Sequence, residues 1–111
     1  MNEKLLVESK CVPCQGGVEA VKGESICLYA NQISKDWKVI NEHHLERDFK
    51  FKNFADALAF VNKVGELAEA EGHHPDIWLS WGKVQIILYT HKINGLHEND
   101  FILAAKIDKL S

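Results

Sequence analysis

The sequence predicts an α+β fold, a four-stranded antiparallel sheet with helices packed on one face, in the order α-β-β-α-β-β-α. Apolar residues recur at helical spacing in three segments and with a two-residue period in others. The strand-like segments also come in neighbouring pairs with short connections, which favour antiparallel pairing. The chain has 111 residues, of which 46% are hydrophobic. This is enough for one core, so we expect a single domain over 1–111, with 1–23 as a loosely structured N-terminal segment.

The first half of the chain is expected to form one helix and two strands. The helical spacing falls in 24–33, at Ile26, Tyr29, Ala30 and Ile33. Strand-forming side chains follow in 37–40. In 45–52, the alternating inward positions are Leu45, Arg47, Phe49 and Phe51. The residues between them along the strand are charged: Glu46, Asp48, Lys50 and Lys52. This strand should therefore bury one face and leave the other in water.

A long helix is expected from Asn53, a residue suited to cap a helix N-terminus, to Gly72. Its apolar stripe consists of Phe54, Ala57, Leu58, Val61, Val64 and Ala68. Gly72 is well placed to end the helix, and Pro75 cannot continue it. His73 and His74 therefore lie between this helix and the next strand.

The next two strands, 77–81 and 84–90, are expected to form a hairpin. Gly82-Lys83 between them suits a type II′ turn. This register pairs Trp81 with Val84 on a buried face, so we interpret Trp81 as a core residue. It also sets His74 opposite His91, with Cβ atoms roughly 5 Å apart. After a loop at Asn94-Gly95, residues 97–110 are expected to form the last helix, with Phe101, Ala104, Ala105 and Leu110 inward.

Composition argues against several classes of protein. The chain carries 13 Lys and Arg against 16 Asp and Glu, a formal net charge of -3. This gives no basic surface to attract nucleic acid. The apolar runs are far shorter than the roughly 20 residues that cross a bilayer, and the N-terminus has no hydrophobic signal region. We therefore expect a soluble cytoplasmic protein with no nucleic-acid or membrane partner.

Three cysteines do not form a disulfide framework. Cys11 and Cys14 have the spacing of a redox pair or of half a zinc site. Pro13 lies between them, and Gly16-Gly17 follow. We favour a structural or incidental role for this segment, and metal or redox use stays open.

The three histidines of the stretch Glu71–His91 have three interpretations. They could be solvated side chains, zinc ligands completed by Glu69, or acid-base groups. Adjacent residues of an extended chain point to opposite faces, which disfavours binding of one ion by His73 and His74 together. Imidazole ionises near neutral pH, so proton transfer suits these residues better. Asp100 has two roles open to it, orienting one ring and stabilising the start of the last helix.

These residues resemble the signature of the pterin-4a-carbinolamine dehydratase family. The matching positions are Glu69, His73, His74, Pro75, Trp81, His91 and Asp100. The resemblance extends from about Trp37 to the C-terminus and leaves out Cys11 to Gly17. His97 stands where the family suggests a hydroxyl residue such as threonine, so we expect a weaker helix cap there.

The resemblance implies a dehydratase that converts 4a-hydroxytetrahydropterin to quinonoid dihydropterin without metal or organic cofactor. It would serve tetrahydrobiopterin recycling after an aromatic amino-acid hydroxylase. His73 and His91 would be the acid-base residues, and His74 would orient the pterin and share in proton transfer. The division of acid and base among them stays open. The remaining substrate-binding candidates are Glu69, Pro75, Thr90, Asp100 and, as an aromatic wall, Trp37.

A second class of function is an interaction protein. Some members of the family also act as dimerisation cofactors for a homeodomain transcription factor. A four-stranded sheet with free edges also favours association into homodimers or tetramers. The zinc protein is the third and weakest alternative.

Overall fold

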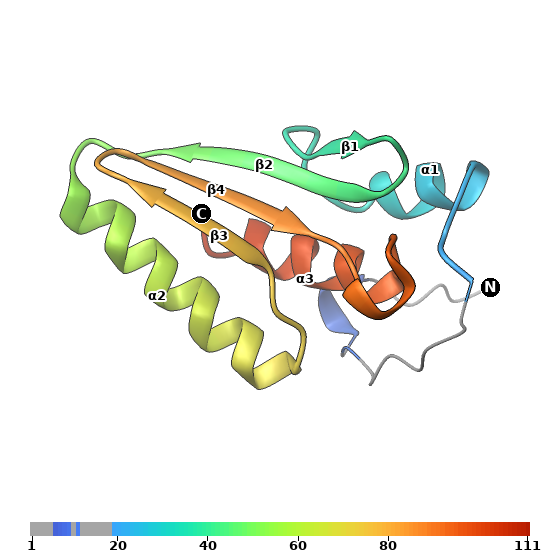
Figure 1. Ribbon diagram of the computed structural model, residues 1–111. Helices are drawn as coiled ribbons and strands as arrows, with labels where there is room; N and C mark the ends of the chain where they lie inside the picture. The colour runs from blue at the N-terminus through green and yellow to red at the C-terminus, as the bar shows by residue number, and fades with distance from the viewer. Residues whose placement is uncertain (1–5, 10, 12–18) are drawn as a thin grey trace.

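The computed structural model describes residues 6–9, 11 and 19–111 of the chain. Their elements follow the predicted order, with a short 3-10 helix at each of two places. The elements are η1 Leu6–Glu8, α1 Glu24–Ala30, β1 Lys38–Ile40, β2 His44–Lys50, α2 Phe54–Glu71, β3 Asp76–Ser80, β4 Lys83–Leu88, η2 His91–Ile93 and α3 Glu98–Asp108. The four strands form one antiparallel sheet in the order β1-β2-β4-β3 (Figure 1). The predicted fold class is confirmed.

The core lies between one face of the sheet and the helices. β4 turns Val84, Ile86 and Leu88 inward, and all three are fully buried. Figure 1 shows α2 and α3 on the same side of the strands, and the two helices contact each other. α3 is buried nearly all round, including Ile102, Leu103 and Ile107, because η1, α1 and α2 all pack against it.

The N-terminal segment takes part in this core. Leu6 in η1 is buried with the core residues, and η1 contacts α3. The expectation of a loose segment over 1–23 is therefore wrong for η1. The segment has too few apolar residues to give a periodic signal, and Leu6 is buried because η1 packs against α3.

The predicted ends of α2 are confirmed. The Asn53 side chain accepts a hydrogen bond from the Asp56 N–H at 2.8 Å. Gly72 adopts the left-handed conformation, with φ 67° and ψ 25°. The His73 N–H then donates to the Ala68 carbonyl at 3.2 Å. This is the hydrogen bond that closes a Schellman-type helix end, and it fixes the backbone at His73.

The hairpin register differs from the prediction by two residues. Leu79 pairs with Val84, and Ser80 and Lys83 form the last pair. The loop is therefore Trp81-Gly82, and the Trp81 side chain is 68% exposed. The prediction that Trp81 is a core residue is wrong, because the turn begins one residue earlier than the glycine suggested.

Close approach, not a left-handed backbone, explains the glycine in this turn. The φ of Gly82 is not positive. The Phe51 N–H donates to the Gly82 carbonyl at 2.8 Å, and a Cβ on Gly82 would lie 2.9 Å from the Phe51 carbonyl oxygen. The end of β2 therefore leaves no room for a side chain.

Candidate active site

Asp100 is the buried centre of the candidate site. Its side chain is 0% exposed in the first turn of α3. Oδ1 lies 2.6 Å from Nε2 of His73, and Oδ2 accepts hydrogen bonds from the Thr90 hydroxyl and the His97 N–H, both at 2.9 Å. One carboxylate thus joins the end of α2, the end of β4 and the start of α3.

The three donors around Asp100 define the tautomer of His73. A carboxylate only accepts hydrogen bonds, so Nε2 of His73 carries the proton that faces Oδ1. The neutral ring then has its lone pair on Nδ1. In its neutral form His73 can therefore accept a proton at Nδ1, the nitrogen that does not face the carboxylate.

The start of α3 is well capped, contrary to the expectation for His97. The Asn99 N–H donates to Nδ1 of His97 at 3.0 Å. The bond from the His97 N–H to Asp100 completes a reciprocal cap. Here the imidazole nitrogen takes the place of a hydroxyl, so the helix start is intact. Asp100 has both of the roles that its position suggested, since it also binds His73.

Thr90 links this network to His91. Its backbone forms an isolated bridge with Gly95, with the Thr90 N–H donating to the Gly95 carbonyl at 2.8 Å. The loop between them contains η2, which begins at His91. His91 is exposed, and its ring centroid lies 4.2 Å from that of Tyr89. The hydroxyl of Thr90 is engaged by Asp100, so Thr90 contributes to the site through that carboxylate.

His74 and Glu69 form an exposed pair beside the network. His74 Nε2 lies 3.5 Å from Glu69 Oε1, and their side chains are 59% and 80% exposed. Such a pair is weak and adjustable. The predicted pairing of His74 with His91 is wrong, because the observed register, continued past the end of β3, sets His74 beside Tyr89. Pro75, between His74 and β3, is half-buried.

Trp37 does not offer an aromatic wall. It is 6% exposed, and its indole N–H donates to Asp108 Oδ1 at 2.7 Å. The same carboxylate pairs with the guanidinium of Arg47 at 2.6 Å, near the far end of α3 from Asp100. Trp37 is thus a core residue that helps to hold β2 and α3 together.

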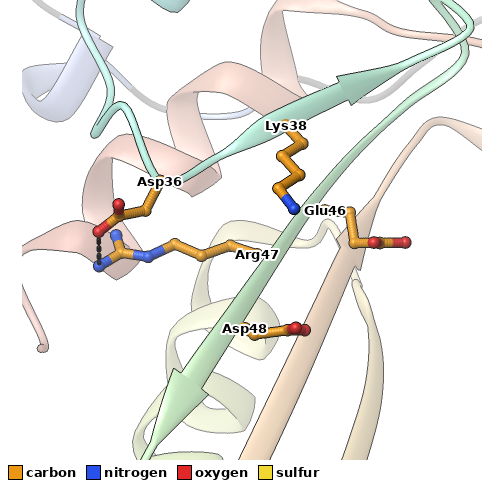
Figure 2. A pocket seen from close by; sticks show the side chains of 5 residues that line it. All are labelled: Asp36, Lys38, Glu46, Arg47 and Asp48. Carbon is orange, nitrogen blue, oxygen red and sulfur yellow. Dashed lines mark hydrogen bonds and ion pairs between the residues drawn. The ribbon is translucent and has the colours of Figure 1, made fainter.

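A pocket beside Arg47 contains none of the predicted site residues. Its lining consists of Asp36, Lys38, Glu46, Arg47 and Asp48. Figure 2 shows Arg47 reaching toward Asp36, with which it pairs at 3.4 Å, while Glu46 and Asp48 point the other way. Arg47 pairs with Asp36 and Asp108, and Asp48 lies 3.6 Å from Lys83, so we assign the pocket a structural role.

Sequence reasoning missed four residues near His91. His43 and His44 at the start of β2, Tyr89 after β4, and Asn94 after η2 surround the ring of His91 or its loop. The two adjacent histidines before an alternating strand were a signal. Using it requires knowing that β2 lies beside β4, which the local pattern does not show.

Cys11 makes structural contacts. Its N–H donates to Glu71 Oε1 at 2.9 Å, and its Sγ lies 3.6 Å from the Asn99 carbonyl oxygen. Burial, with the carboxylate of Glu71 adding to it, raises the pKa of the Cys11 thiol to about 12. The thiolate needed for redox or metal chemistry is thus disfavoured at neutral pH. Cys14 lies outside the described residues.

The described part of the chain has neither a metal-binding cluster nor a membrane-spanning helix. Within residues 6–9, 11 and 19–111, no group of three or more His, Cys, Asp or Glu side chains is arranged to hold a metal ion. The zinc interpretation therefore has no ligand set there. No helix in the same residues is long and apolar enough to cross a membrane.

Known proteins similar to this chain agree with the signature. Residues 20–110 match the family described as pterin 4 alpha carbinolamine dehydratase. A protein of Alkaliphilus metalliredigens that carries the name pterin-4-alpha-carbinolamine dehydratase is 59% identical over 94% of each chain. The crystal structure of a transcriptional coactivator/pterin dehydratase from Brucella melitensis has a TM-score of 0.76 and 26% identity, covering 83% of this chain and 98% of that one.

A pterin dehydratase-like protein identified as a RuBisCO assembly factor in the alpha-carboxysome is more distant. It has a TM-score of 0.58 and 27% identity, and the match covers 68% of this chain and 88% of that one. The match over 20–110 and the identity to named relatives confirm what the histidine signature predicted. This chain belongs to the pterin 4 alpha carbinolamine dehydratase family.

Proposed function

We propose that this protein dehydrates 4a-hydroxytetrahydropterin to quinonoid dihydropterin by histidine acid-base catalysis. The observation that carries the proposal is the hydrogen-bond network of Asp100, which holds His73 with its lone pair on Nδ1. A buried carboxylate that fixes a largely buried imidazole, 12% exposed, is an arrangement suited to proton transfer. Family membership supplies the substrate class.

The reaction needs two proton movements. The 4a-hydroxyl leaves as water when an acid protonates it, and a ring nitrogen loses a proton as the C=N bond forms. His73, with its lone pair on Nδ1, suits the role of general base that takes the proton from the ring nitrogen. His91, which is exposed on η2, suits the role of general acid that protonates the 4a-hydroxyl. His74 and Glu69 form an adjustable pair that can orient the polar edge of the pterin.

We place the reaction in tetrahydrobiopterin recycling, downstream of an aromatic amino-acid hydroxylase. The support is chemical. A 4a-hydroxylated tetrahydropterin must be produced by a monooxygenase that uses the reduced pterin, and its dehydration returns a dihydropterin that a reductase can use again.

The test is the decay of enzymatically generated 4a-hydroxytetrahydropterin, followed by absorbance. Wild-type protein should accelerate it, and His73→Ala and His91→Ala should each reduce the acceleration at least tenfold, about 1.4 kcal/mol of transition-state stabilisation. His97→Asn is the matched control, because asparagine also caps helices and only the imidazole is lost. No acceleration by folded wild-type protein would overturn the proposal.

A second candidate function is partner binding. It is favoured by the exposure of Trp78 and Trp81, at 66% and 68%, on and beside the edge strand β3. Exposed apolar side chains at an unpaired strand edge are typical of association surfaces. The names of the two similar solved structures also include a coactivator and an assembly factor.

We infer that the edge of β3 joins two copies of this chain into a homo-oligomer. Sedimentation velocity should show a species larger than the monomer, and Trp78→Lys with Trp81→Lys should convert it to monomer. His73→Ala with His91→Ala should leave association unchanged. A wild-type monomer at all concentrations would exclude this surface as a self-association site.

A further inference from the structure

Four aromatic rings form a cluster at the end of the sheet. We call His43, His44, Tyr89 and His91 the ring cluster. The Tyr89 centroid lies 4.2 Å from that of His91, 4.7 Å from that of His43 and 6.4 Å from that of His44. These separations are within the range of aromatic contacts. Tyr89 thus contacts both His43 and the proposed acid His91.

Hydrogen bonds fix the ring of His43. Its Nε2 lies 2.9 Å from the amide oxygen of Asn94, which can only accept, so Nε2 carries the proton. Its Nδ1 lies 3.0 Å from Nδ1 of His44. In the neutral ring, His43 Nδ1 accepts from His44. Both nitrogens of His43 are therefore engaged.

Asn94 connects His43 to the turn that carries His91. It ends η2 in the left-handed conformation, with φ 50° and ψ 48°. Its N–H donates to the His91 carbonyl at 3.1 Å, and its side chain accepts from His43. The loop before β2 is therefore connected to His91 in two ways. Its bond to Asn94 holds the backbone of His91, and the contact of His43 with Tyr89 supports the ring of His91.

The turn that delivers His43 is strained. Asn41 and Glu42 have φ of 52° and 55°, and the His43 N–H donates to the Ile40 carbonyl at 2.8 Å. Glutamate rarely adopts this conformation, which favours glycine and asparagine. Such strain persists where surrounding contacts over-determine the backbone, and it is frequent near functional sites.

We propose that His43 is a positioning residue for His91. The hydrogen bond to Asn94 fixes the turn, and the contact with Tyr89 fixes the plane against which the His91 ring lies. This inference rests on the proposed function, in which His91 exchanges a proton with the pterin. Misplacement of an acid-base group by about 1 Å can cost about 10²-fold in rate.

Two variants isolate the bond between His43 and Asn94. Asn94→Gly removes the acceptor and keeps a residue that tolerates positive φ. His43→Phe keeps the ring and removes the donor. Each should lower kcat by about tenfold and change KM by less than about twofold. Because both remove the same bond, the double variant should be no slower than about the slower single variant.

The control variants separate positioning from general loosening. Asn41→Gly is the same replacement at another positive φ, in the turn before His43, and should leave kcat within about twofold of wild type. His43→Gln keeps a donor where Nε2 lies and loses the ring. It should recover part of the rate lost in His43→Phe, since the amide can still bind Asn94.

A second measurement does not depend on activity. Ring contact with Tyr89 should shift the His91 imidazole protons upfield in the NMR spectrum, and the signals are assigned by their absence from His91→Ala. In Asn94→Gly and His43→Phe these signals should move toward the unfolded position, and in Asn41→Gly they should not. If wild-type protein does not dehydrate the pterin, the proposed function fails, and the NMR result still tests the positioning. Unchanged His91 signals and unchanged kcat in Asn94→Gly would overturn the inference.

Discussion

Asp100→Asn is the sharpest test of the His73 tautomer. The amide has nearly the shape of the carboxylate and offers one acceptor oxygen in place of two. That oxygen can serve the Thr90 hydroxyl and the His97 N–H, as Oδ2 does now. The NH₂ group then faces Nε2 of His73, which must become an acceptor. The ring proton therefore moves to Nδ1, which no longer has a free lone pair and cannot act as the base.

The size of the effect follows from the loss of the charge on residue 100, because the bond to His73 changes from a charge-assisted bond to a neutral one. Hydrogen bonds to charged groups contribute about 1.5–3 kcal/mol and neutral ones about 0.5–1.5 kcal/mol, so the free energy of unfolding should fall by about 1–2 kcal/mol. The rate should fall much further. In serine proteases the corresponding replacement imposes the wrong histidine tautomer and lowers kcat by about 10⁴-fold. We expect a decrease of about 10²- to 10⁴-fold here, since His91 and His74 remain.

The assay combines three measurements on the Asp100→Asn protein. Long-range ¹H–¹⁵N NMR reports the protonated nitrogen of His73, urea titration gives stability, and pterin dehydration gives kcat. Asp108→Asn is a matched control on the same helix, because Asp108 also accepts three bonds, from the Ser34 N–H, Trp37 Nε1 and Arg47 Nη1. It should lose similar stability and keep kcat within about twofold. An Asp100→Asn protein with Nε2–H on His73 and nearly full kcat would refute this reasoning.

Four further predictions concern the backbone and the thiol. Gly72→Ala meets no atom within 4 Å and still must adopt φ 67°, so the free energy of unfolding should fall by about 1–2 kcal/mol in urea titration. Gly82→Ala places a Cβ 2.9 Å from the Phe51 carbonyl oxygen, so its Tm should fall, and an unchanged Tm would show that the hairpin yields freely. At pH 8, iodoacetamide should label the exposed Cys27 and leave Cys11 unmodified, because the Cys11 pKa is raised to about 12. Mass spectrometry of the modified protein checks this. Since the unfolded Cys11 thiol ionises near 9.0 and the folded one near 12, the free energy of unfolding should fall as pH rises through that window, and Cys11→Ala should remove this part of the decrease.

The sequence by itself determined the α-helices, the strands and several of their ends. Asn53 and Gly72 define α2 because capping and positive φ are local properties of one residue and its neighbours. The alternation around Leu45 and Phe49 was enough to predict a strand with one buried face, and both are buried. The histidine signature was likewise readable, because its residues are fixed in spacing along the chain.

Only the tertiary structure decided how these elements meet. The turn began one residue early, which shifted the β3–β4 register by two residues and exposed Trp81. The order of the strands set β2 beside β4, and that brought His43 to Tyr89 and His91. The bond between His73 and Asp100 spans 27 residues. Periodicity reports which face of an element is buried, whereas register and strand order depend on contacts between distant segments, and a local pattern contains neither.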